Sequence, residues 1–125
     1  MFNKWKFILK VFDLHPPRII SNFDFSLLKN IDGYILMYDI TNKTSFNYIT
    51  DYYNNMEKYL ISPQCCLLIG NKCDEKENRE VSYEEGKNLA KQLNITFFEI
   101  SIKTGKNVKE IFDYLLNEIC SLVSI

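Results

Sequence analysis

The side chains with the clearest chemical potential lie in "GNKCDE", residues 70–75, directly after the apolar run "CCLLI". The Asp74 carboxylate has two coplanar oxygens, which can accept hydrogen bonds from the ring N1–H and the exocyclic amine of guanine. Adenine offers no such pair of donors, so the wrong base would leave buried acceptors facing each other. Asn71 can bond the other edge of a purine, and the stem of Lys72 can lie along the base or sugar face. The pattern therefore indicates guanine recognition.

A second motif, "SIKTG" at residues 101–105, follows the next strand-like segment. There the backbone N–H of Ile102 can meet the guanine O6, and Lys103 can cover the second face of the base. A polar turn after a strand is the competing explanation for either motif alone. Because two such motifs follow two successive strands, we favour guanine recognition over coincidence by about four to one.

These motifs depend on strands and helices that alternate along the chain. Four segments have the apolar, β-branched and aromatic character of strands: 5–12, 33–39, 65–71 and 96–101. Helical spacing or capping signals predict helices around 23–30, over 44–60, after a Ser82–Glu85 capping box, and after Asn107, which caps the last helix with Glu110.

The alternation implies one α/β domain, residues 1–125, with a doubly wound and mostly parallel sheet flanked by helices. In such sheets ligands bind beyond the carboxyl ends of the strands. We therefore expect the loops after Asp39, Ile69 and Ile100 to lie at one edge, where they bring the two motifs together.

The bulk composition excludes several other kinds of site. The net charge of −1 gives no indication of a nucleic-acid or membrane partner. The four cysteines include no C-x-x-C pair, and Cys65 and Cys66 should point to opposite faces of a strand. These features favour buried thiols in a reducing compartment over a metal site or a disulfide. Cys120 is not at the prenylation position. We expect a cytoplasmic chain with no membrane anchor of its own.

Three stretches make the chain similar to a known family: "GYILMYDITNKTSF" (33–46), "LLIGNKCD" (67–74) and "SIKTGKNVKEIF" (101–112). They resemble the Ras-superfamily small GTPases, the Rab branch most closely, from about residue 6 to about residue 120. The resemblance implies GTP or GDP as ligand, protein effectors or regulators as partners, and a peripheral role at vesicle membranes in traffic. It assigns the guanine site to Asn71, Lys72, Asp74, Ser101, Ile102 and Lys103, with Ile102 in place of the usual alanine.

The chain departs from the family pattern at its second switch. The family has Asp-x-x-Gly-Gln there, whereas this chain has "DLHPP", residues 13–17. Asp13 matches the metal-side aspartate. Pro16 replaces the glycine whose N–H holds the γ-phosphate, and proline has no N–H to donate. Pro17 replaces the glutamine that orients the attacking water, so this remnant indicates loss of hydrolysis and leaves no catalytic residue.

The family's phosphate-binding loop has no counterpart in the chain, because no G-x-x-x-x-G-K-[ST] occurs in its 125 residues. The phosphate lysine and the Mg²⁺-binding hydroxyls of that loop are therefore missing, and we expect Mg²⁺ only if an N-terminal part supplies them. A bidentate base contact is worth about 1–3 kcal/mol. With a stacked lysine the total reaches roughly 4 kcal/mol, which corresponds to a dissociation constant on the order of 1 mM.

Three interpretations remain open. The first is a truncated or degenerate Rab-like GTPase, a pseudo-GTPase that keeps base recognition but not hydrolysis. The second is a non-catalytic module that binds effectors or regulators through a GTPase-like fold. The third is a fragment of a complete Rab GTPase. An unrelated parallel α/β domain of the response-regulator kind is disfavoured, because the first predicted strand of this chain carries no acidic cluster.

Overall fold

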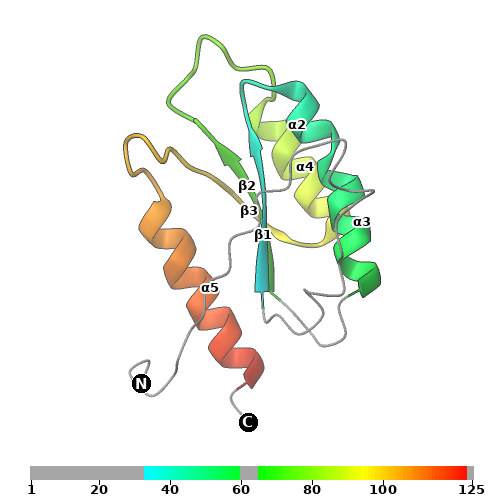
Figure 1. Cartoon of the computed structure of the whole chain (residues 1–125). Coiled ribbons are helices and arrows are strands. Elements are labelled where there is room, and N and C mark those ends of the chain that lie inside the picture. Colours follow the sequence, from blue (N-terminus) through cyan, green and yellow to red (C-terminus); the bar gives the residue numbers. More distant parts are fainter. Residues whose placement is uncertain (1–32, 60–64, 124–125) are drawn as a thin grey trace.

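The computed structural model describes residues 33–59 and 65–123 of the chain, and the side chains of 33–58 and 65–118. The predicted strand 5–12 and helix 23–30, together with Asp13, Pro16 and Pro17, lie outside the described residues. The elements in chain order are β1 (Gly33–Asp39), α2 (Lys43–Asn47), α3 (Ile49–Tyr59), β2 (Cys65–Asn71), α4 (Tyr83–Leu93), β3 (Thr96–Glu99) and α5 (Val108–Val123) (Figure 1).

The three strands form a parallel sheet in the order β1-β2-β3, which confirms the predicted α/β class. Gly33 pairs with Cys65, and the register runs without a break to Asp39 and Asn71. Each step from one strand to the next moves in the same direction across the sheet. Right-handed crossovers then place the connecting helices on a single face. Figure 1 shows α2, α3 and α4 on one side of the sheet and α5 on the other.

Each face of the sheet carries its own hydrophobic core. Towards α3 and α4 the core includes Leu36, Leu68 and Ala90, and towards α5 it includes Leu67 and Ile111. Leu67 and Leu68 are completely buried, and burying a side chain of this size contributes about 1.5–3 kcal/mol.

The two adjacent cysteines divide between the faces, as the sequence predicts. Cys65 is part of the core under α5, while Cys66 packs against the opposite core. Burial raises the pKa of the Cys65 thiol to about 11 and that of the Cys66 thiol to about 12. Both thiols are therefore protonated at neutral pH and behave as apolar core groups.

The helix predicted over 44–60 is instead two helices, α2 and α3, which meet at Tyr48. Asn42 caps α2 by accepting a hydrogen bond from the backbone N–H of Ser45. The Ser45 hydroxyl also donates to the backbone carbonyl of Asn42, at 2.7 Å. Serine and asparagine side chains of this kind favour the start of a helix, so these bonds fix where α2 begins.

The two predicted caps of the later helices have different outcomes. Ser82 and Glu85 form the expected capping box at the start of α4, with both reciprocal bonds at 3.0 Å. Asn107 precedes α5, but its φ of 65° is left-handed and its side-chain amide donates to the Glu99 carbonyl at 2.8 Å. The Asn107 side chain thus ties the last helix back to β3, and the cap predicted from Asn107 and Glu110 is wrong in its geometry.

Close packing of α4 on the sheet requires glycine at position 86. A Cβ at Gly86 would lie 2.3 Å from the Tyr38 hydroxyl oxygen and 2.6 Å from Cζ of Phe97. Tyr38 is 2% exposed, and its hydroxyl is a buried polar atom without a hydrogen-bond partner among the described residues. The contact therefore fixes the distance between α4 and the sheet.

We expect Gly86→Ala to lower the free energy of unfolding by about 2 kcal/mol or more, because the added methyl group overpacks this contact. Chemical denaturation measures the change. Lys87→Ala, an exposed substitution on the same helix, should stay within about 0.5 kcal/mol of the parent. Adding Tyr38→Phe to Gly86→Ala removes the nearest atom and should recover part of the loss. An unchanged stability of Gly86→Ala would contradict the packing described.

Candidate functional site

The carboxyl ends of the strands meet at one edge of the sheet, at the top of Figure 1. Strand pairing continues into the loops that follow. The N–H of Ile40 donates to the Asn71 carbonyl at 3.1 Å, and the N–H of Cys73 donates to the Ile100 carbonyl at 3.0 Å. The loops after β1, β2 and β3 are therefore joined by backbone hydrogen bonds, and the two sequence motifs lie beside each other.

Asp74 and Ser101 connect the two motifs directly. The Ser101 hydroxyl donates to Oδ1 of Asp74 at 2.6 Å and accepts from the backbone N–H of Thr104 at 3.1 Å. Ser101 is completely buried, whereas Asp74 is exposed. The bond from Ser101 lowers the pKa of the Asp74 carboxyl, so Asp74 is an oriented carboxylate at neutral pH.

Asn71 and Ile102 form a second connection between the motifs. The backbone N–H of Ile102, which we expected to be available for a guanine O6, donates to Oδ1 of Asn71 at 3.3 Å. The Ile102 side chain is 61% exposed. Its bulk therefore projects largely into solvent while its N–H faces the neighbouring loop.

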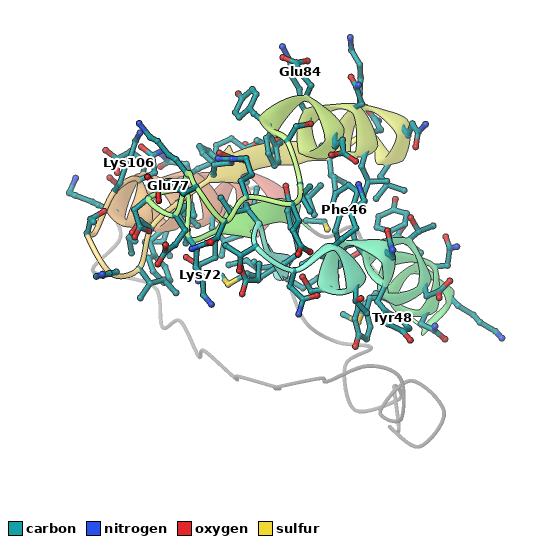
Figure 2. The ribbon with its side chains drawn as sticks, turned by 90° about the horizontal axis from the view of Figure 1, so that it is seen from above. Phe46, Tyr48, Lys72, Glu77, Glu84 and Lys106 are labelled. Atoms are coloured by element: carbon teal, nitrogen blue, oxygen red, sulfur yellow. The ribbon has the colours of Figure 1, made fainter. Side chains whose placement is uncertain are left out.

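Lys72 lies between Asn71 and Asp74 and reaches back to β1. Its Nζ lies 2.8 Å from Oδ2 of Asp39, and its backbone has a left-handed φ of 71°. Figure 2 looks down on this edge and labels Lys72 beside the loop that follows β2. Left-handed backbone at a residue other than glycine costs roughly 1–2 kcal/mol, so neighbouring contacts must maintain it.

Lys72 and Asp39 each stabilise the charged form of the other. Partial burial raises the pKa of the Asp39 carboxyl, but hydrogen bonds from Lys72 and Thr41 outweigh burial and hold the pKa below its ordinary value. The hydrogen bond to Asp39 raises the pKa of the Lys72 ammonium. Both groups are therefore charged at neutral pH.

Lys103 lies on a tight turn that closes the second motif. The N–H of Gly105 donates to the Ser101 carbonyl at 2.8 Å, and the N–H of Ser101 donates to the Lys106 carbonyl at 3.2 Å. Gly105 has a φ of 83°, a conformation that glycine adopts without strain. Lys103 is exposed, and its positive charge helps to lower the pKa of Asp74.

Sequence reasoning missed two ion pairs that support the site. One is the Asp39–Lys72 pair, which an acidic residue directly after the apolar run of β1 could have indicated. The other joins Arg79 to Glu99 through two bonds of 2.7 and 2.9 Å and holds the loop after β2 against the end of β3. The sequence spacing carries no signal for that second pair.

Asp13, which the resemblance places on the metal side, lies outside the described residues. Within 33–58 and 65–118, no three His, Cys, Asp or Glu side chains are grouped so that they could hold a metal ion.

None of the helices that the structure describes has both the length and the apolar character needed to cross a bilayer.

Comparison with known proteins gives consistent matches. The family model of the Ras family matches residues 8–121. Ras-related protein Rab-3A of Homo sapiens is 46% identical over 92 residues, which cover 74% of this chain and 42% of that protein. Ras-related protein Rab-3C of Bos taurus is 35% identical over 122 residues, which cover 98% of this chain and 54% of that protein. The chain thus spans about half the length of these relatives.

We expect Ser101→Ala to raise the pKa of the Asp74 carboxyl towards its ordinary value, because the variant removes the hydroxyl that stabilises the ionised form. A lowered folded pKa stabilises the fold above the pKa of the unfolded carboxyl. That contribution is lost as pH falls through the folded pKa, and it should shrink in the variant. Carboxyl-carbon NMR across an acid titration measures the shift. Thr104→Ala keeps the Ser101–Asp74 bond and serves as control, and an unmoved Asp74 pKa in Ser101→Ala would refute the assignment.

Proposed function

This chain belongs to the Ras family, in its Rab branch, and on that premise we propose that the loops after β2 and β3 recognise the guanine base of GTP or GDP. The observation that carries the proposal is the 2.6 Å bond from buried Ser101 to exposed Asp74. It orients an ionised carboxylate at the sheet edge before any ligand is bound. Preorganised acceptors of this kind select a base by its pattern of donors.

The contacts at this edge suit guanine in three ways. The oxygens of Asp74 can accept from N1–H and the 2-amino group, and Oδ1 keeps a free lone pair after the bond from Ser101. The N–H of Ile102 can donate to O6, which would share or replace the Asn71 oxygen that accepts it in the structure. Lys72 and Lys103, one from each motif, can cover the two faces of the ring.

Phosphate binding and GTP hydrolysis depend on residues other than those that contact the base. The 125 residues contain no phosphate-binding loop motif, and Pro16 and Pro17 occupy the family's glycine and glutamine positions. We propose that this stretch holds the nucleotide by its base alone and does not hydrolyse GTP, which is the behaviour of a pseudo-GTPase. Mg²⁺ would bind with the phosphates, and Asp13 is the residue that the family pattern assigns to it.

The proposed cellular role follows the family. A Rab-like chain would bind effectors or regulators and act in vesicle traffic, peripheral to membranes through these partners. The competing interpretation is a non-catalytic module that binds effectors or regulators. Exposed tyrosines would suit such a module, but those at 48, 52 and 53 lie in or against the core. Tyr52 is 9% exposed and belongs to the core, and Tyr48 and Tyr53 pack against that core.

We expect the 125-residue chain to bind GDP no more tightly than about 0.1 mM, because base contacts supply only a few kcal/mol. Isothermal titration calorimetry and NMR titration measure the constant. A dissociation constant in the micromolar range or below would contradict the proposal that the base alone is held.

Asp74→Asn should change the base preference from guanine to xanthine. Its side-chain amide would place a donor opposite the 2-amino group of guanine but would match the 2-oxo group of xanthine. We expect GDP binding to weaken about tenfold, and xanthosine diphosphate to bind the variant more tightly than GDP does. The bond from Ser101 can still reach the amide oxygen, so the fold should be unaffected.

The matched control for this exchange is Glu77→Gln, which neutralises an exposed carboxylate on the same loop. It should leave the preference for GDP over xanthosine diphosphate unchanged. If Asp74→Asn also left that preference unchanged, Asp74 would not be the residue that reads the base.

A further inference from the structure

The ion pair between Asp39 and Lys72 joins the ends of two neighbouring strands. Asp39 is the last residue of β1 and is in register with Asn71, the last residue of β2. Lys72 follows immediately, and its Nζ lies 2.8 Å from Oδ2 of Asp39. The pair therefore spans the part of the edge that lies beside the first base-recognition motif.

The two carboxylate oxygens of Asp39 have different partners. Oδ1 accepts from the backbone N–H of Thr41 at 2.8 Å and from the Thr41 hydroxyl at 2.6 Å, while Oδ2 faces Lys72. The backbone N–H of Asp39 also donates to the Ser45 hydroxyl, at 3.0 Å. The turn between β1 and α2 thus fixes the carboxylate, and the fixed carboxylate in turn holds the lysine.

A lysine stem that is free in solution samples many rotamers and loses this freedom when a ligand lies against it. Lys72 is 51% exposed along its side chain, so surrounding atoms do little to restrict it. A contact that orders the stem before the ligand arrives reduces the entropic cost of binding.

We propose that Asp39 is a positioning residue of the base site, which holds Lys72 Nζ so that the stem lies across the edge where the guanine ring is bound. This inference rests on the proposed function. It assigns a role to Asp39, which belongs to neither sequence motif, because it is the last residue of β1.

Asp39→Asn tests the role with little disturbance of the turn. Thr41 presents two donors to Oδ1, so the amide oxygen should remain there and place the amide nitrogen opposite Lys72. Donor then faces donor, and the Lys72 contact is lost. We expect the dissociation constant for GDP, measured by NMR titration, to rise about threefold, the size typical of a half-exposed ion pair.

Lys72→Met and the double variant complete the comparison. If Asp39 acts through Lys72, then Asp39→Asn should change GDP affinity in the parent but not in the Lys72→Met background. A role of Asp39 in the turn alone would give the same loss in both backgrounds and would overturn the proposal. An unchanged affinity of Asp39→Asn in the parent would overturn it as well.

Asp113→Asn is the matched control, because it makes the same substitution in an exposed ion pair, Lys109–Asp113, on α5. It should leave GDP affinity at the parent value.

Side-chain NMR relaxation of Lys72 in the ligand-free chain tests the positioning by Asp39 separately from guanine recognition. If the parent binds no GDP, guanine recognition fails. Increased motion of the Lys72 stem in Asp39→Asn would then still support its positioning by Asp39, and unchanged motion would refute it.

Discussion

The central strand β2, Cys65–Asn71, has a strand on each of its edges and helices over both of its faces, and the rest of the structure depends on this placement. Leu67, Leu68 and Ile69 are completely buried, so a shift of one residue in register would move large apolar side chains to the wrong face. The register in turn brings Asp39 opposite Asn71. The polar edge is therefore positioned by hydrophobic packing several residues away.

At that edge, buried or half-buried groups orient more exposed ones. Ser101 is completely buried and holds exposed Asp74, while the turn around Thr41 holds Asp39, which in turn holds Lys72. The arrangement keeps the exposed charges in water, where they are stable without a ligand, and uses short neutral donors to fix the direction of the carboxylates. Such a site can discriminate between bases through geometry even when its affinity is small.

The sequence predicts the parts of the structure that follow from periodicity and local capping. The strands 33–39 and 65–71, the split of Cys65 and Cys66 between the faces, and the Ser82–Glu85 box are all as expected, because burial and local hydrogen bonds decide them. The break at Tyr48 leaves no trace in a hydrophobic pattern, and the left-handed Asn107 accompanies a side-chain bond to the Glu99 carbonyl that such a pattern does not record. The Asp39–Lys72 and Arg79–Glu99 pairs join residues 33 and 20 positions apart, and only the folded sheet shows that they meet.

The central claim is that the edge formed by the loops after β2 and β3 recognises guanine through its pattern of donors. The most direct measurement is a pair of NMR titrations of the ¹⁵N-labelled chain, one with GDP and one with ADP at the same concentrations. We expect GDP to move the backbone amide signals of 71–74 and 101–103, most of all that of Ile102, and ADP to leave these signals nearly unmoved. Equal shifts with both nucleotides, or shifts confined to other parts of the chain, would contradict it.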